Sequence, residues 1–528
     1  MTAATPSSIR ALARPGRAAA APAAGDRAAL LLLALLIVYA GWIGSAREVD
    51  FDFWYHMAEG RALLATHHFS FADTFSHTAL GRAYPPTEWL FQVGIFALYS
   101  MLGGAGIVLY KTIAVGAWAA VMLAAGRARG AGAASAVAVG ALAVLAAMNR
   151  FMARPEWITF VGFAWVAAHI DAEERGRAGR GRRAILLAVI LVWANAHPGV
   201  FFGVALLGLW AIARIIGGRR AGPAAALATA AARDAAGAHA ATPRAAILLA
   251  LAAAALTLAT PAGLGNVGFF VHHADVYRRL SVEEFQKLPL VAPLAFIWVY
   301  LVFAAILFIL RFRDLSGFHR IAIPLFLALA IRNSRLVPLF VGLSAPLLPQ
   351  WLERSVPALA ARRALARGVA IAAVAACVGY RIVETPRWGP IALEIDATQY
   401  PKGAADFLEA NGVGANGVRA PLYNFHGYGS YLLWRGFRVS TDARLPLYAD
   451  VFQQFRQKPF ESIGRYGISA VVVPSPESVN FELDPIANGF LKRRAGWSLV
   501  YRDDVAVVFL KRGAGFDAVI AAHEAAGP

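Results

Sequence analysis

Asp50-Phe51-Asp52-Phe53-Trp54-Tyr55-His56 follows closely after the first long apolar run of the chain, residues 30–46. The run is apolar enough to predict a membrane helix. Carboxylates are costly beside hydrocarbon, so at a membrane surface they usually have a partner or a function. A solvated loop with interfacial aromatic residues would explain the rings, but it would not explain two acids at i and i+2.

The composition of the whole chain agrees with this first run. Apolar residues make up 59% of the sequence, charged residues 16%, and the mean hydropathy is +0.55. A soluble domain is about 45–50% apolar and about 25% charged, so we expect a polytopic α-helical membrane protein. The formal charge of +18 does not indicate a nucleic-acid partner, because the arginines are dispersed in short loops between apolar runs. Cys377 is the single cysteine, which excludes an intramolecular disulfide.

The arginine-rich loops predict which way the chain crosses the membrane. They fall on one side of the membrane only if residues 88–102 do not cross it but lie along the outer surface as an interfacial helix. The polar residues Glu88 and Gln92 and the Gly-Gly pair at the end of this run favour such a helix. About eleven spans then remain, with a cytoplasmic tail (1–27), a transmembrane domain (28–383) and a first outer loop (47–104). The other apolar runs are 105–126, 131–148, 155–170, 184–196, 198–216, 245–261, 291–310, 319–331, 335–352 and 368–383.

The composition changes after Glu384, where the segments become shorter and more polar. Residues 403–411 have the pattern of an amphipathic helix, and residues 427–434 that of a helix with an aromatic face. The patterns at 437–440, 468–473 and 497–510 predict strands, the last as a hairpin. We therefore expect a small α/β domain over residues 384–528, on the extracytoplasmic side.

Three acids of the first outer loop are candidates for catalysis. Asp50 and Asp52 would face one side of an extended segment, where they could share a divalent cation or where one could act as general base. Glu88 has two open interpretations. It is either a catalytic group or an acid in the first turn of a helix that Thr87 caps.

Four arginines lie at outer helix ends, against the inside bias. They either snorkel to the interface or bind the phosphate of a lipid head group through bidentate hydrogen bonds. Asn195 and His197 lie in a tight turn between two short runs, where the histidine either supports the turn or contacts a ligand. The arginines are Arg150, Arg154, Arg332 and Arg335.

These motifs together resemble a bacterial branch of the GT-C class of integral-membrane glycosyltransferases. The resemblance covers most of the chain, and no single motif carries it alone. The matching stretches are Asp50-x-Asp52-Phe-Trp54-x-His56, Asp73-Thr-Phe75-Ser76-x-Thr78, Gly81-Arg82, Glu88-Trp89-Leu90, Asn195-x-His197, Arg332-Asn333, Asn424 to Gly429-Ser-Tyr431-Leu, and Asp442-x-Arg444.

The resemblance implies a polyprenyl-phosphate sugar donor, transfer on the outer side of a bacterial inner membrane, and Asp50 or Asp52 as the base that activates the acceptor. The acceptor class stays open between a glycan, a lipid and a protein. No cofactor is implied with certainty, since some relatives use a divalent cation and others do not. The predicted site has Asp50, Asp52 and Glu88 as catalytic residues, and Trp54, His56, Arg150, Arg154, Asn195, His197, Arg332, Asn333 and Arg335 as substrate-binding residues.

Two other classes of function fit the sequence less well. A transporter or lipid flippase tends to show repeated halves and ionisable groups at the bilayer midplane, whereas here no repeat is evident and the polar residues gather at the outer helix ends. A scaffold that only displays the C-terminal domain would leave the first-loop acids unexplained. The absence of a Gly-x-x-x-x-Gly-Lys-[Ser/Thr] loop, a Gly-x-Ser-x-Gly elbow and a His-Glu-x-x-His motif argues against ATPase, serine hydrolase and zincin chemistry.

The predicted topology can be tested by cysteine labelling. In a variant without Cys377, a cysteine placed in residues 171–183 should resist a membrane-impermeant thiol reagent added to intact cells, because this Arg-rich loop is expected inside. A cysteine at Asp504, in the C-terminal domain, should react. Modification of the 171–183 cysteine from outside would contradict the arrangement.

Overall fold

The structure of the chain is a computed structural model. It describes residues 24–48, 50–220, 242–280, 285–290, 295–384, 392–414, 420–478, 480–484, 486–487, 489 and 496–524. Most of the predicted cytoplasmic tail, residues 1–23, lies outside the described residues.

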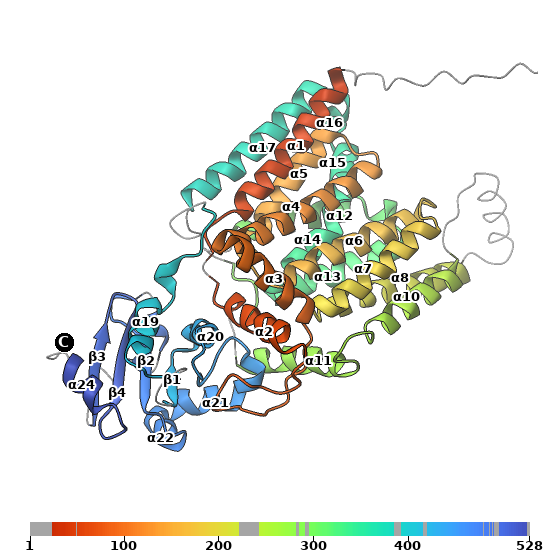
Figure 1. Ribbon diagram of the computed structural model, residues 1–528. Coiled ribbons are helices and arrows are strands. Elements are labelled where there is room, and N and C mark those ends of the chain that lie inside the picture. The colour runs from red at the N-terminus through yellow and green to blue at the C-terminus, as the bar shows by residue number, and fades with distance from the viewer. Residues whose placement is uncertain are drawn as a thin grey trace, which may run out of the picture.

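Long apolar helices form a bundle in the first two thirds of the chain. Figure 1 shows α1 (Ala24–Gly44), α4 (Gly104–Ala128), α5 (Ala133–Ala146) and α17 (Arg363–Val383) side by side. A second group packs around α6 (Glu156–Glu174). The other bundle helices are α7 (Arg180–Ala196), α8 (Val200–Arg220), α10 (Pro243–Leu256), α12 (Ala295–Leu310), α13 (Gly317–Arg332), α14 (Val337–Ser344), α15 (Leu348–Ser355) and α16 (Pro357–Ala361).

Tryptophans fill much of the bundle core, and glycines make room for them. Trp193 of α7 packs so closely against two neighbouring helices that a Cβ added at Gly162 would lie 2.5 Å from its ring, and one at Gly203 2.6 Å. Because cores pack at crystal-like density, these two positions admit no larger residue without repacking. Trp118, Trp157, Trp193, Trp210 and Trp351 are all fully buried.

Four helices of the described residues are long and apolar enough to cross a membrane, namely 27–44, 104–128, 200–217 and 363–383. Shorter apolar helices occupy four further predicted runs, among them α3 (Trp89–Leu102). The count of eleven spans therefore stays a prediction. The run at 335–352 is not one helix as expected, but the bent pair α14 and α15, at 63°. Pro349 at the start of α15 lacks the amide proton needed to continue a helix.

The C-terminal region contains a four-stranded sheet with the order β1-β2-β4-β3. The strands β1 (Leu422–Asn424) and β2 (Ala470–Pro474) are parallel, and β3 (Trp497–Arg502) and β4 (Ala506–Lys511) form the predicted hairpin. Strand β1 was not expected because three residues carry too little pattern. The strand predicted at 437–440 is wrong: among the described residues this segment makes a single isolated bridge, between Ser76 and Val439.

Both faces of this sheet are buried by helices. Val472, Val508 and Leu510 face a cluster that includes Tyr428, whereas Val471 and Phe509 pack on the other side. Such continuous burial agrees with the unbroken apolar runs of β2 and β4. The helices are α19 (Lys402–Ala410), α20 (His426–Trp434), α21 (Leu445–Gln457), α22 (Pro459–Arg465) and α24 (Asp517–His523), and the predicted amphipathic and aromatic helices correspond to α19 and α20.

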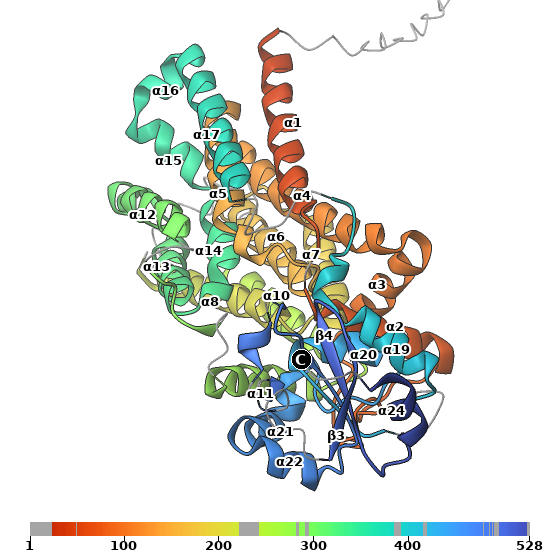
Figure 2. The same ribbon diagram turned by 90° about the vertical axis from the view of Figure 1, so that its left-hand side faces the viewer.

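The first loop lies between the bundle and the C-terminal region. In Figures 1 and 2, α2 (Phe53–Thr66) and α11 (Gly265–Arg279) lie beneath the bundle, where α2 contacts α20 and α11 contacts α21. The two parts of the chain are therefore joined through a layer of short helices.

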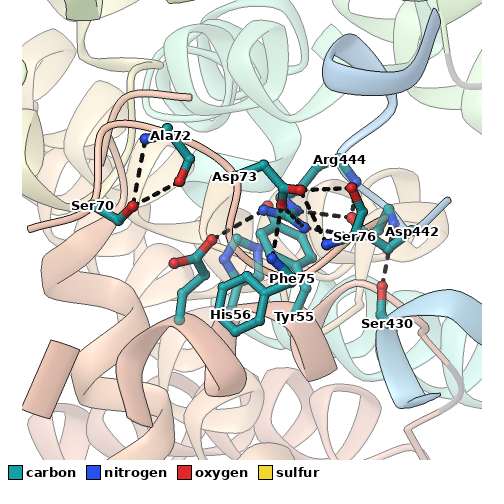
Figure 3. Close-up of polar contacts among 12 residues, drawn as sticks. Tyr55, His56, Ser70, Ala72, Asp73, Phe75, Ser76, Ser430, Asp442 and Arg444 are labelled. Atoms are coloured by element: carbon teal, nitrogen blue, oxygen red, sulfur yellow. Dashed lines mark hydrogen bonds and ion pairs between the residues drawn. The ribbon is translucent and has the colours of Figure 1, made fainter. Parts of the chain in front are cut away.

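One buried arginine links the first loop to the C-terminal region. The guanidinium of Arg444 contacts Asp442 at 2.7 Å, Asp73 at 2.8 Å and Glu59 at 3.2 Å. Figure 3 shows the carboxylate of Asp73 directed at Ser76, which donates to it at 2.6 Å, and at Arg444. Burial raises the pKa of Glu59 to about 7, and Arg444 opposes that rise. Although burial alone would raise the pKa of Asp442, Arg444 holds it below its usual value.

Removing this cation should loosen the chain. We expect Arg444→Met to lower the free energy of unfolding by about 3–5 kcal/mol, because it leaves buried carboxylates without their partner. Thermal unfolding in detergent and limited proteolysis of the C-terminal region would measure the loss. Arg465→Met is the matched control, since the Arg465 side chain is 59% exposed. Equal unfolding temperatures for the two variants would contradict a linking role for Arg444.

A candidate active site between the first loop and the C-terminal region

A cavity of about 960 Å³ lies where the first loop, the bundle ends and the C-terminal region meet. Eight of the twelve residues that the sequence singled out as catalytic or substrate-binding line it. They are Asp52, His56, Glu88, Arg154, His197, Arg332, Asn333 and Arg335. Four do not line it, namely Asp50, Trp54, Arg150 and Asn195.

Asp50 and Asp52 meet at one arginine. Arg154 binds Asp50 through two hydrogen bonds of 2.8 and 2.9 Å, and its Nε lies 3.1 Å from Asp52. The expected extended segment is wrong here, because Asp52 has a helical backbone (φ −70°, ψ −36°) and directly precedes α2. The arginine, not strand geometry, therefore brings the acids together. Asp50 is buried behind Arg154, and Asp52 faces the cavity.

Trp54 belongs to an aromatic core. Its ring lies 4.9 Å from that of Tyr431 and 5.3 Å from that of Tyr400, both edge-on. Tyr400 donates a hydrogen bond of 2.7 Å to the main-chain oxygen of Asp50. This packing holds the start of α2 against the C-terminal region, so Trp54 occupies a supporting position and not the cavity wall predicted for a substrate-binding residue.

Glu88 is the second carboxylate of the cavity. The prediction of Glu88 as an acid in the first turn of a helix that Thr87 caps is wrong, because α3 begins at Trp89 and Glu88 itself is at the cap position, where its side chain makes no capping hydrogen bond. One carboxylate oxygen accepts from the Tyr55 hydroxyl at 3.3 Å and lies 3.8 Å from His56 Nδ1, and the other lies 3.6 Å from His197 Nε2. Burial raises the pKa of Glu88 to about 7, against the opposing effect of the Tyr55 hydrogen bond.

Asn195 fastens helices together and does not face the cavity. Its side-chain oxygen accepts from Trp89 Nε1 at 2.9 Å, and its amide donates to the main-chain oxygens of Leu191 and Ala259 at 2.9 and 3.0 Å. These bonds hold the start of α3 against the end of α7. Asn195 thereby positions the segment that carries Glu88.

The outer arginines differ in their partners. Arg150 is buried and binds Glu156 through its Nε at 3.0 Å. Arg335 lines the cavity and also contacts Glu156, at 2.7 Å. Arg332 lines the cavity without an ion pair or hydrogen bond in the part of the chain that the structure describes. The side chain of Asn333 accepts from the main-chain amide of Arg335 at 3.0 Å, which shapes the turn.

Sequence reasoning missed two cations of the cavity wall. Lys287 and Arg456 line it, and neither has an ion pair or hydrogen bond among the described residues. Lys287 follows the polar outer loop in the chain, which is a signal that could have found it. Arg456 has no such signal, since it lies on the amphipathic helix α21 of the C-terminal region.

The cavity thus combines an excess of positive charge, two carboxylates and a partly apolar wall. Its lining contains five cationic side chains against two carboxylates, so positive charge is in excess. The three cations without an ion pair among the described residues, Lys287, Arg332 and Arg456, are exposed. An excess of one sign of charge in a cleft favours a ligand of the opposite sign, here an anion. Part of the wall is apolar and comes from Phe202, Phe270, Leu280, Leu329 and Leu336. Within the described ranges, no cluster of three or more His, Cys, Asp or Glu residues could hold a metal ion.

Comparison with known proteins identifies the fold. No model of a protein family matches the chain, and no curated protein matches it. The crystal structure of ArnT from Cupriavidus metallidurans in the apo state is similar at a TM-score of 0.50 and 16% identity, covering 92% of this chain and 98% of that chain. The structure of ArnT bound to undecaprenyl phosphate gives a TM-score of 0.48 and 14% identity with the same coverage. The GT-C-like fold predicted from the motifs is confirmed.

Proposed function

We propose that this chain is a membrane glycosyltransferase that moves a sugar from a polyprenyl-phosphate donor to an acceptor on the extracytoplasmic side of a bacterial inner membrane. One observation carries the proposal. Three cations that have no ion pair among the described residues, two carboxylates and an apolar wall share a single cavity. A lipid-linked sugar phosphate has the matching parts, namely an anion, a sugar and a hydrocarbon tail. The fold shared with ArnT and the first-loop motifs support it.

Arg332 is the best candidate for binding the donor phosphate. It has no competing carboxylate among the described residues, whereas Arg150 is neutralised by Glu156 and Arg154 by the first-loop acids. Charge stabilisation of a leaving phosphate is a large catalytic term. Arg335 and Lys287 line the same cavity and would add to it.

Asp52 is the proposed first-loop base. It faces the cavity, and Arg154 orients it at 3.1 Å while Asp50 holds Arg154 from behind. The acceptor hydroxyl attacks the anomeric carbon, a carboxylate takes the hydroxyl proton, and the bond from that carbon to the lipid phosphate oxygen breaks. The lipid phosphate leaves with the electron pair.

The proposed topology places the cavity at the outer surface, with residues 384–528 outside and about eleven crossings in the domain 28–383. A flippase for the same lipid would also need the cations, but it would have no use for a proton-accepting carboxylate. Loss of sugar transfer with retained lipid binding on removal of Asp52 would therefore separate the two functions.

Asp52→Asn should reduce sugar transfer by about two to four decades, the usual cost of losing a general base. Asp50→Asn should cost less, because it disturbs only the orientation of Arg154. Transfer from a polyprenyl-phosphate sugar by the purified protein would measure both. Asp504→Asn, which removes a solvent-exposed acid on the β3–β4 turn, is the matched control. Near wild-type turnover in Asp52→Asn would refute the assignment.

Arg332→Ala should weaken binding of a polyprenyl-phosphate sugar by about tenfold to a hundredfold, since a hydrogen bond to a charged group contributes about 1.5–3 kcal/mol. Arg332→Lys should recover little, because an ammonium lacks the bidentate fork. Titration of the lipid against the purified variants gives the affinities. Arg362→Ala, an exposed arginine away from the cavity, should bind as the wild type does. Equal affinity in Arg332→Ala would mean that this side chain only snorkels.

A further inference from the structure

The ring of His197 makes more polar contacts than the end of a helix requires. It ends α7, and its ring is packed between Thr159 of α6 and the turn that begins α8. The indole Nε1–H of Trp193 donates to Thr159 Oγ1 at 2.9 Å, and the main-chain amide of Gly199 donates to His197 Nδ1 at 3.0 Å. Thr159 Oγ1 lies 2.7 Å from the same nitrogen.

These contacts determine which ring nitrogen carries the proton. A main-chain amide can only donate, so Nδ1 of His197 must be an acceptor. The Thr159 oxygen accepts a hydrogen bond from the Trp193 indole N–H, so the Thr159 hydroxyl is free to donate its own hydrogen to Nδ1. Nδ1 thus has two donors and no proton, so the neutral ring carries its hydrogen at Nε2. Burial lowers the pKa of His197 to about 3, which keeps the ring neutral at physiological pH.

The surrounding backbone is built for this arrangement. A Cβ added at Gly199 would lie 2.2 Å from Thr159 Oγ1 and 2.6 Å from His197 Nδ1. No other residue allows the amide to approach the ring so closely. Trp193 in turn fits only because Gly162 and Gly203 lack side chains.

The Nε2 atom of His197, which carries this proton, lies near the cavity carboxylate of Glu88. It lies 3.6 Å from one oxygen of Glu88, slightly beyond a hydrogen bond, and such contacts often tighten once a ligand is bound. The other oxygen of Glu88 accepts from Tyr55. The further titratable or charged groups that face or act on Glu88 are His56 of α2, Tyr84, Tyr110 of α4, Glu156 of α6 and Arg335.

We infer that His197 is a positioning residue for Glu88. Gly199 and Thr159 hold its ring in one tautomer, so that it presents a permanent Nε2–H to Glu88 and holds this carboxylate towards the reacting atoms in the cavity. The inference rests on the proposed function and deepens it. Glu88 becomes a second proton-exchanging group beside Asp52. The two carboxylates differ in their surroundings, since Asp52 contacts an arginine, whereas Glu88 accepts from the Tyr55 hydroxyl and lies near the neutral His197 ring. Such a difference is the usual basis for two carboxylates with distinct roles.

The tautomer can be measured without any assay of transfer. Protein labelled with ¹⁵N-histidine gives ring-nitrogen shifts that distinguish the two neutral forms from the cation, and His197→Ala identifies the signal. We expect the Nε2–H form throughout pH 5–9, and also in Thr159→Val, which removes the hydroxyl but leaves the Gly199 amide donating to Nδ1. An Nδ1–H form, or a charged ring at pH 6, would overturn the inference.

The effect on Glu88 is a second readout independent of turnover. An infrared titration of the carboxyl band, assigned with Glu88→Gln, should show the pKa of Glu88 rising in His197→Ala, because the ionised form loses a donor. His197→Gln is the conservative variant, since its amide can place an N–H near the position of Nε2. It should restore the wild-type pKa. An unchanged pKa in His197→Ala would mean that His197 only fills space.

Kinetics complete the test. His197→Ala should lower kcat by about tenfold to a hundredfold with little change in the donor KM, and the acidic limb of its pH profile should move to higher pH. His197→Gln should recover most of the rate and the original limb. A Gln variant no better than Ala would refute positioning. If the wild type transfers no sugar while the tautomer and the Glu88 titration behave as expected, the proposed function fails and the positioning of Glu88 stands.

Discussion

The contact between Arg444 and three acids is the constraint on which the rest of the site depends. The acids are Glu59 of α2, Asp73 of the first loop and Asp442 of the segment that leads into α21. A buried guanidinium without carboxylates would be prohibitively costly, so the C-terminal region can only dock where Glu59 and Asp73 meet it. The neighbours of Arg444 in the chain, Ala443 and Leu445, line the cavity. The same docking that pairs the charge therefore builds one wall of the site.

The bundle holds the first loop from the opposite side through another buried ion pair. Lys111 of α4 binds Glu48 at 2.9 Å, with both side chains fully buried. Glu48 also accepts from the main-chain amides of Asp50 and Ala153. The segment that carries Asp50 is thus held by the Glu48–Lys111 pair before it and by the Glu59–Arg444 pair after it. A carboxylate placed in this way keeps its orientation without help from a ligand.

Arginines with the same sequence signal have different roles in the structure. Arg150 and Arg332 both lie beside an asparagine at helix ends that are predicted to face outward. Arg150 is buried against Glu156, six residues along the chain, whereas Arg332 lines the cavity without a partner among the described residues. Nothing in either motif distinguishes them, because the decisive property is where the nearest carboxylate lies after folding.

The sequence by itself determined the apolar helices, the β3–β4 hairpin and the gathering of chemistry in the first loop, because these depend on periodicity and composition over a few residues. Only the tertiary structure decided that Asp52 and not Asp50 faces the cavity, that Trp54 supports it, and that Arg456 belongs to it. The reason is physical. Arg154 lies about one hundred residues from the acids it orients, and Arg444 lies more than three hundred and fifty from Glu59 and Asp73. No local pattern encodes contacts of such separation.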